Sequence, residues 1–197
     1  MKSAMSTILT RRSVYSLGRE LPISEEKLLE LISDCVKASP TSFNMQSPRV
    51  LVLLGEQHTL FWNVTLRILR AKATSDFTKT EKKIAGLAAG YGTIIYFEDQ
   101  DTVTEYQQKF PRSAPRIPTW SEHNSAMLQY AIWTALAAED IGASLHHYDP
   151  DITEFVKSQW SIPASWSITG EMAFGSIAEP GVEKAKLDTA ERMIIAR

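Results

Sequence analysis

The sequence predicts an α+β fold in which a small mixed or antiparallel sheet is flanked by helices. Two short aliphatic runs, at residues 50–54 and 93–97, have the length and composition of strands. Segments with apolar residues at helical spacing separate these runs, and they differ widely in length. A repeating strand–helix–strand unit is therefore not expected, and we expect the helices to pack on a small sheet instead.

Capping residues and apolar spacing indicate the first helices. A short helix is expected over residues 3–9 and a longer one over residues 24–38. Ser24 is a suitable N-cap for the longer helix, and the two glutamates that follow it favour the positive end of the helix. Its apolar stripe consists of Leu28, Leu29, Ile32, Cys35 and Val36. Cys35 is therefore interpreted as a core residue rather than a nucleophile.

Strands and helices follow one another in the centre of the chain. The run at 50–54 is continuously aliphatic and ends at Gly55, which predicts a strand buried on both faces. The next helix carries Leu60, Phe61, Val64 and Ile68 on one side. A glycine cluster at 86–92 precedes the strand at 93–97, so its position does not fit a dinucleotide-binding fingerprint. We expect these glycines to end a helix and turn the chain.

Three prolines predict an irregular connection over residues 110–120, which is a candidate cover for a bound ligand. Ser121 is expected to cap a helix over residues 122–141. Because this helix is apolar on most sides, we expect it either at the centre of the domain or in the middle of a dimer interface. Strands at 143–148 and 171–177, with a short helix between them, complete the prediction.

Composition and charge exclude several classes of protein. The length of 197 residues predicts one domain over residues 1–197, with two small domains as the alternative. The chain is 44% hydrophobic and 22% charged, which excludes a disordered or fibrous chain. With 21 Lys and Arg against 23 Asp and Glu, the net charge is −2. We therefore expect no general attraction to nucleic acid or to an anionic membrane, and any anion site must be built from a few local side chains.

Cysteine content and hydropathy indicate the compartment. A single cysteine excludes an internal disulfide and a multi-thiolate metal site, and it fits a reducing environment. No apolar signal-peptide core precedes Arg11, and no uncharged apolar run reaches the roughly 18–20 residues that span a bilayer. A cytoplasmic protein is expected.

The first candidate binding element is Arg11-Arg12-Ser13. Two guanidinium groups and a hydroxyl at a predicted helix end can hold a phosphate through charge-assisted hydrogen bonds. The alternative is a solvated cationic helix end that interacts with the helix dipole.

The second candidate is the polar loop at residues 39–48, which directly precedes the first aliphatic strand. Prolines stiffen both of its ends, and the amides of Asn44 and Gln46 match the donor–acceptor edge of a flat heterocycle. The alternative is an ordinary polar turn with capping hydrogen bonds.

Two further segments carry weaker signals. His146 and His147 are adjacent on a predicted strand and point to opposite faces, so no metal site is expected there. One of them either faces a pocket or is a buried imidazole with satisfied hydrogen bonds. Lys184 and Lys186 lie near the C-terminus, where by themselves they indicate a solvated basic turn.

Taken in order, these segments resemble the nitroreductase family of FMN-dependent flavoproteins. The resemblance is to its branch of short enzymes related to the fungal fatty-acid-repression nitroreductases and their bacterial counterparts. Residues 11–13 match the family's R-R-S element, and residues 39–46 resemble its S-P-[ST]-x-x-N-x-Q element. Residues 127–133, 142–148 and 174–176 follow in the order of that branch. The similarity covers nearly the whole chain.

The resemblance implies an α+β sandwich that forms an intertwined homodimer, with one FMN at each of two interface sites. By motif, Arg11, Arg12 and Ser13 would hold the phosphate and the ribityl chain. Lys184 and Lys186 would add a second cationic contact to the phosphate. The residues implied to contact the ribityl chain or the ring, in part from the partner chain, are Pro40, Thr41, Ser42, Asn44 and Gln46.

Two positions depart from the family pattern. Many nitroreductases carry Lys or Arg beside the flavin pyrimidine where this chain has Tyr15, which removes a cation near the reduced ring. The short branch often has Gln where this chain has His146, next to Leu145. An imidazole there is expected to bond the flavin edge or to change protonation near neutral pH.

The implied activity is a ping-pong reaction in which NADH or NADPH reduces FMN and a nitroaromatic or quinone-like acceptor then reoxidises it. Because the flavin supplies the chemistry, no side chain is assigned a catalytic role. Two alternatives are a flavin-binding redox sensor or regulator with little turnover, and a flavin-free interaction domain.

Overall fold

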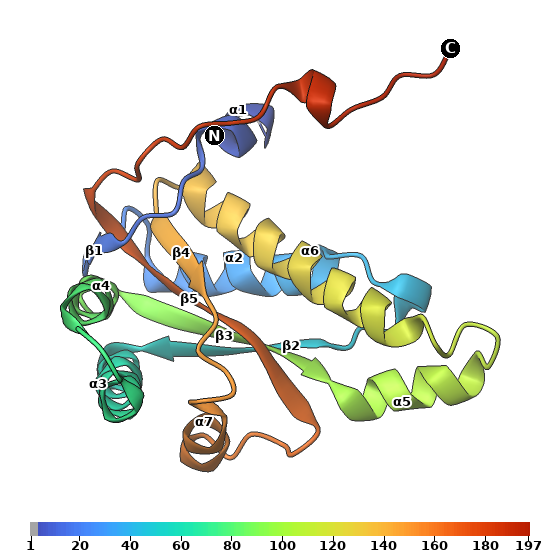
Figure 1. Cartoon of the computed structure of the whole chain (residues 1–197), viewed down its shortest axis with the longest axis horizontal. Coiled ribbons are helices and arrows are strands. Elements are labelled where there is room, and N and C mark those ends of the chain that lie inside the picture. Colours follow the sequence, from blue (N-terminus) through green and yellow to red (C-terminus); the bar gives the residue numbers. More distant parts are fainter. Residues whose placement is uncertain (1–3) are drawn as a thin grey trace.

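The longest strand, β5 (Trp166–Glu179), organises a five-stranded sheet (Figure 1). It pairs with β1 (Ser16–Gly18), β3 (Gly92–Asp99) and β4 (Gly142–His146). β3 pairs in turn with β2 (Pro48–Leu54). All four pairings are antiparallel, so the predicted α+β fold with a small antiparallel sheet is confirmed.

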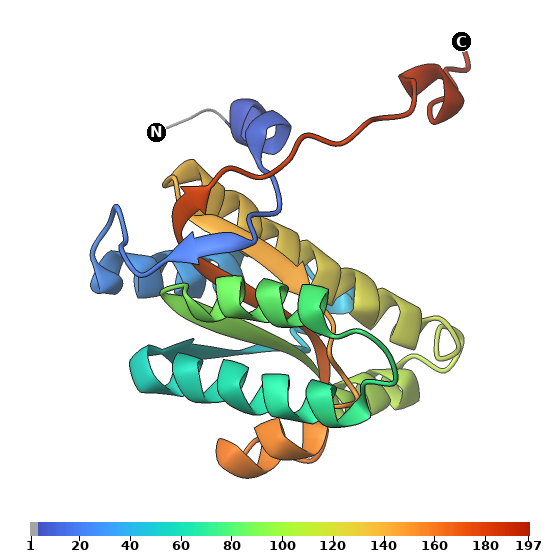
Figure 2. The same cartoon turned by 60° about the vertical axis from the view of Figure 1, so that its left-hand side comes forward.

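Helices cover both faces of the sheet (Figure 2). The computed structural model describes residues 4–197. Its α-helices in chain order are α1 (Ala4–Thr10), α2 (Glu25–Ala38), α3 (Gly55–Lys72), α4 (Thr78–Ala88), α5 (Gln100–Lys109), α6 (Ile117–Ala138) and α7 (Thr153–Gln159). Two 3-10 turns, η1 (Ser42–Asn44) and η2 (Thr189–Glu191), add to these. The helices α2 and α6 pack on one face, and α3, α4 and α7 pack on the other.

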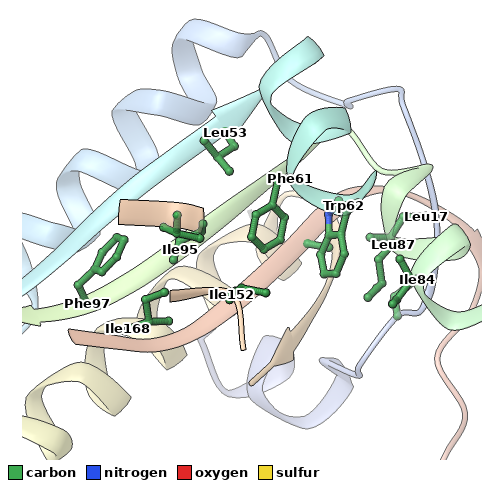
Figure 3. Packing of buried hydrophobic residues seen from close by; sticks show 13 residues of the cluster. Leu17, Leu53, Phe61, Trp62, Ile84, Leu87, Ile95, Phe97, Ile152 and Ile168 are labelled. Atoms are coloured by element: carbon green, nitrogen blue, oxygen red, sulfur yellow. The ribbon is translucent and has the colours of Figure 1, made fainter. Parts of the chain in front are cut away.

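The central strand β3 divides the core, because successive side chains of a strand point to opposite faces. Ile94 and Tyr96 belong to the cluster that includes α2 and α6. Ile95 and Phe97 belong to the cluster that includes α3, α4 and α7. Figure 3 shows this second cluster, in which Phe61 of α3 is turned toward the strands.

The predicted cap and end of α2 are confirmed, whereas two residues of its predicted apolar stripe, Leu29 and Val36, are exposed. The Ser24 hydroxyl accepts a hydrogen bond from the Lys27 backbone N–H at 3.2 Å, and the helix ends at Ala38. Cys35 is half-buried and packs against the core cluster. Burial, together with the neighbouring Asp34, raises the pKa of its thiol. The thiol is therefore poorly suited to nucleophilic chemistry.

The prediction that β2 is buried on both faces is wrong. β2 is an edge strand that pairs only with β3 among the described strands, and most of its side chains are half-exposed. Leu53 alone within it is fully buried. A continuous aliphatic run therefore does not tell whether a strand lies inside the sheet or at its edge with partly buried side chains.

The start of α6 also differs from the prediction. The helix begins at Ile117, with Pro118 in its first turn, so the last part of the predicted irregular stretch is helical. Proline is tolerated there because its missing N–H has no partner within the helix. Ser121 is buried inside the helix and donates a hydrogen bond to the Pro118 carbonyl at 2.8 Å, so it is not the cap.

Other boundaries shift without changing the fold. β4 ends at His146, two residues before the predicted end, and β5 is longer than predicted at both ends. In α3 the buried face is rotated from the predicted stripe: it consists of His58, Phe61, Trp62 and Thr65. The glycine cluster contributes Gly86 to α4, and its later members turn the chain into β3 as predicted.

The C-terminal segment leaves the sheet at the end of β5 and extends past α1 (Figures 1 and 2). Apart from η2 it has no regular structure, and nearly all of its side chains are exposed. Across residues 4–197, no helix is long and apolar enough to cross a membrane.

Candidate functional site

Basic residues from both ends of the chain meet in one hollow of about 240 Å³. We call it the Arg11 hollow, and the residues that line it are Arg11, Arg12, Ser13, Tyr15, Val182, Lys184, Ala185 and Lys186. The structure therefore brings together two motifs that lie about 170 residues apart in the sequence. Lys184 and Lys186 are part of this group rather than an isolated basic turn.

Local backbone contacts create the hollow. After α1 ends at Thr10, the Val14 N–H donates to the Ala143 carbonyl at 3.0 Å, which ties the segment to β4. Gly181 allows the C-terminal segment to cross this point closely, because a Cβ there would lie 2.6 Å from both the Arg12 Cβ and the Ser13 carbonyl oxygen. The absence of a side chain at residue 181 thus positions the two lysines.

The two arginines differ in how many of their guanidinium N–H groups have hydrogen-bond partners. The Arg11 guanidinium lies over the Trp133 ring at 4.1 Å, and its Nε and Nη1 are buried with no hydrogen-bond partner. Arg12 Nη1 donates to the carbonyls of Leu9 and Arg11, each at 2.8 Å, and Nη2 lies 3.6 Å from the Glu183 carboxylate. Arg12 caps α1, whereas Arg11 holds donors that a bound anion would satisfy.

A larger cavity of about 620 Å³ adjoins this hollow, and Tyr15 and Val182 line both. We call it the Tyr15 cavity, and its other lining residues are Ser16, Lys79, Lys82, Lys83, Gly86, His146, Glu179, Pro180 and Gly181. Gly86 lets α4 approach closely here, since a Cβ at that position would overlap the Tyr15 carbonyl oxygen. Sequence reasoning missed the three lysines, although their spacing with Gly86 places all four on one helix face.

His146 is the histidine that faces the cavity, and it is 7% exposed. Its Nε2 lies 2.8 Å from the Ser144 hydroxyl, and the rings of Tyr15 and Tyr148 are each 5.8 Å away between centroids. Burial, aided by the nearby Lys83 cation, lowers the pKa of His146 to about 3. The expected change of protonation near neutral pH is therefore wrong, because the imidazole is neutral there.

The neighbours of His146 point elsewhere, as alternation along a strand requires. His147 is exposed. Leu145 packs against the core cluster between the sheet and α2 and α6, so it does not line the cavity. Among residues 4–197, no three or more His, Cys, Asp or Glu side chains are grouped to hold a metal ion.

The polar loop that contains Pro40, Thr41, Ser42, Asn44 and Gln46 has an unusual backbone. Asn44 and Gln46 have positive φ angles of 53° and 50°, which are uncommon for residues other than glycine. Two hydrogen bonds fix this shape: Gln46 N–H donates to the Thr41 hydroxyl, and Ser42 N–H donates to Asn124 Oδ1, both at 3.0 Å. The loop is therefore a constrained surface rather than a loosely held turn.

Within one chain this loop does not meet the Arg11 hollow. It is attached to α6 at Asn124, whereas Arg11 stacks on Trp133, about 14 Å further along the same helix at 1.5 Å per residue. None of the lining residues of the Arg11 hollow or the Tyr15 cavity comes from the loop. The predicted cover at residues 110–120 lies with the loop, since Phe43 stacks on Phe110 at 4.3 Å.

Two buried carboxyl groups were not predicted from the sequence. Glu171 is fully buried and lies opposite His146 in the β4–β5 pair. Its Oε2 accepts a hydrogen bond from the Tyr148 N–H at 3.1 Å, and its Oε1 has no partner. Burial raises the pKa of Glu171 to about 8, and it raises that of Glu98, on β3, to about 7. Each carboxyl lies in a strand whose other buried side chains are mostly apolar.

The architecture defines a nitroreductase-fold protein. A protein from Desulfovibrio desulfuricans of this fold, solved in complex with FMN, superposes with a TM-score of 0.70 at 18% identity, covering 100% of this chain and 98% of that one. Nitroreductase CinD from Lactococcus lactis, in complex with chloramphenicol, superposes with a TM-score of 0.91 at 39% identity, covering 99% of this chain and 100% of that one.

The chain belongs to the nitroreductase family, whose model matches residues 8–176. The nitroreductase FRM2 of Saccharomyces cerevisiae is 29% identical over 175 residues, which cover 87% of this chain and 86% of that protein. The family resemblance seen in the sequence is thereby confirmed.

Proposed function

We propose that this chain is an FMN-dependent oxidoreductase that uses NADH or NADPH to reduce nitroaromatic or quinone-like acceptors by a ping-pong mechanism. Membership of the nitroreductase family supports an oxidoreductase. The similarity to CinD, solved with the nitro compounds chloramphenicol and 4-nitrophenol, supports the acceptor class. The similarity in fold to an FMN complex supports the cofactor. We treat residues 1–197 as one FMN-binding domain.

The observation that carries the proposal is the unsatisfied Arg11 guanidinium in a hollow shared with Lys184 and Lys186. Four cationic side chains line the hollow, and the carboxylate of Glu183 lies beside Arg12. This excess of positive charge suits the phosphate of FMN, which is a dianion near neutral pH. The Ser13 side chain adds an uncharged donor at the same place.

The Tyr15 cavity suits the ring of the cofactor. Tyr15 and the neutral imidazole of His146 both line the cavity, so a ring edge can exchange a hydrogen bond with an uncharged His146 ring. Ser144 already engages His146 Nε2, so a hydrogen bond to a ligand would use Nδ1. When bound, FMN accepts a hydride from the reduced nicotinamide and passes reducing equivalents to the acceptor. The side chains bind, orient and exclude water.

We also propose that the working unit is a homodimer. Apolar side chains are exposed on α1, on α6 and in the C-terminal segment; they include Met5, Leu9, Met127, Tyr130 and Ile194. An apolar hollow of about 490 Å³ lies between α2 and α6. In a dimer, the loop at residues 40–46 of one copy would lie against the Arg11 hollow of the other. Such an arrangement unites the two halves of the site that one chain keeps apart.

The absorption spectrum of the purified protein tests the proposal. A flavin spectrum that bleaches on addition of NADH or NADPH and returns on addition of 4-nitrophenol or a quinone is expected. A colourless protein that does not take up added FMN would overturn the proposal and would favour a flavin-free interaction domain. A bound flavin that both nucleotides reduce slowly, with no turnover, would indicate a redox sensor instead.

A further inference from the structure

Three lysines on α4 form one wall of the Tyr15 cavity. Lys79, Lys82 and Lys83 all line it, and they share a helix face with Gly86, which lies against Tyr15. Figure 2 shows α4 running beside β1, which follows Tyr15 directly. The proposed cofactor does not account for this wall, because the phosphate has its own cationic hollow.

The lysines lie at different distances from the cofactor end of the cavity. With a rise of 1.5 Å per residue, Lys82 is about 6 Å and Lys79 about 10 Å along α4 from the Gly86 contact with Tyr15. Lys83 is half-buried, with its Nζ 5.3 Å from the Tyr148 ring centroid, whereas Lys79 and Lys82 are exposed. These two side chains are therefore free to move and reach a group that extends outward from the ring site.

Little negative charge opposes them. Among the residues that line the cavity, Glu179 is the one carboxylate, and His146 is neutral at physiological pH. Glu81, which precedes Lys82 on α4, forms an ion pair with Arg70 of α3 rather than with these lysines. A chain with a net charge of −2 thus concentrates three cations on one wall of its larger cavity. Such focusing attracts an anion.

We propose that Lys79 and Lys82 bind an anionic group on the second substrate, beyond the part of that substrate that meets the ring. The group is either the carboxylate of an aromatic acceptor or the 2′-phosphate of NADPH, since both are compact oxyanions carried at a distance from the reacting atoms. This inference rests on the proposed function and specifies its substrate class. The two lysines determine specificity and take no part in hydride transfer.

The test replaces both lysines in the FMN-loaded protein, as Lys79→Gln/Lys82→Gln. The matched control is Arg67→Gln, which removes a cation from an exposed position on α3, outside the lining of the cavity. One pair of measurements compares KM for 4-nitrobenzoate and for its uncharged analogue 4-nitrobenzamide, with NADH as reductant. The other compares KM for NADPH and for NADH with 4-nitrobenzamide as acceptor. Dissociation constants of the two acceptors come from changes in flavin absorbance of the oxidised protein.

The double variant should raise one of the two KM ratios, that of 4-nitrobenzoate to 4-nitrobenzamide or that of NADPH to NADH, about tenfold, in the range of roughly 2- to 30-fold expected for two exposed ion pairs. The control should leave the ratio unchanged. In the unmodified protein, binding of the anionic compound should weaken with added salt, and this salt dependence should diminish in the double variant. The dissociation constant for 4-nitrobenzoate should rise in parallel with its KM.

Each outcome decides a separate point. A rise confined to 4-nitrobenzoate assigns the lysines to the acceptor, and a rise confined to NADPH assigns them to the reductant. Ratios that stay unchanged, or that change as much in Arg67→Gln, overturn the inference while the proposed function stands. Equal increases in KM for both members of a pair also overturn it, because they indicate a change in cavity shape. A protein without flavin overturns the proposed function as well.

Discussion

The Arg11 guanidinium lies over the indole of Trp133, with 4.1 Å between its Cζ and the ring centroid. Trp133 is itself held, since its Nε1 donates to the Ala143 carbonyl at 3.2 Å. The same carbonyl accepts the Val14 N–H, so β4, α6 and the segment after α1 meet at one atom. This arrangement holds Arg11 against α6, where its Nε and Nη1 are buried with no hydrogen-bond partner.

Arg11→Ala should weaken FMN binding about 10- to 150-fold, since a hydrogen bond to a charged group contributes about 1.5–3 kcal/mol. Titration of the apoprotein with FMN, followed by flavin fluorescence, measures the dissociation constant. Arg12→Ala is the matched comparison, and we expect a smaller effect because Arg12 already bonds two carbonyls of its own segment. A larger loss in Arg12→Ala would contradict this assignment of roles.

Gly86→Ala should destabilise the fold by about 1–3 kcal/mol, because the new Cβ would overlap the Tyr15 carbonyl oxygen and force α4 away from it. Urea denaturation measures the free energy of unfolding. Ala85→Ser, at the adjacent exposed position of the same helix, should change it by less than about 0.5 kcal/mol. Equal effects at both positions would show that α4 does not pack closely on Tyr15.

Glu171 should make the protein less stable as the pH rises. Burial raises its pKa from 4.5 to about 8 in the folded state, so the folded protein favours the protonated carboxyl. The contribution of Glu171 to the free energy of unfolding is fully present below pH 4.5 and is lost as the pH rises to about 8. Its size is on the order of a few kcal/mol.

Glu171→Gln keeps the shape and removes the titration. We therefore expect the decrease in unfolding free energy between pH 5 and pH 8 to be smaller in this variant than in the unmodified protein. Glu154→Gln, at an exposed position on α7, should retain the full decrease. If Glu171→Gln declines as steeply as the unmodified protein, the carboxyl is ionised throughout and the direction of its pKa shift is wrong.

The C-terminal segment should contribute to dimerisation. Ile194 is 95% exposed and lies beside two other exposed apolar residues, Met193 and Ile195. Replacing all three with Ser should raise the dissociation constant of the proposed dimer by at least about tenfold, because burial of each side chain contributes about 1.5–3 kcal/mol. Sedimentation equilibrium measures the constant. The variant leaves Lys184 and Lys186 in place, and a monomeric unmodified protein would contradict the prediction.

Local signals were sufficient for much of the fold. Ser24 caps α2 as its sequence context predicts, and the aliphatic run in β3 lies in the centre of the sheet. Predictions of helix starts and strand burial failed where the same residue types occur in more than one structural position. Ser121 has the character of a cap but lies inside α6, because the helix begins earlier, at Ile117, with Pro118 in its first turn. The run in β2 has the composition of a buried strand but lies at the sheet edge in one chain.

The candidate site was predictable as motifs but not as an arrangement. The R-R-S element at residues 11–13 and the loop at residues 39–48 were recognisable because their residue types carry specific donors and acceptors. Their separation along α6, with the loop at Asn124 and Arg11 at Trp133, was not recognisable, because it depends on how helices pack. The lysines of α4 had no separate signal, since a basic helix is usually only a solvated surface.

By itself, the sequence determined the fold class, the family and the residue types that can bind a phosphate. These properties depend on the spacing of residues within short segments, so they can be predicted without knowing how distant segments pack. The tertiary structure alone decided that Lys184 and Lys186 join Arg11, that Arg11 and not Arg12 keeps free donors, and that His146 stays neutral. Each of these depends on burial and on contacts between distant segments, which arise only when the chain packs.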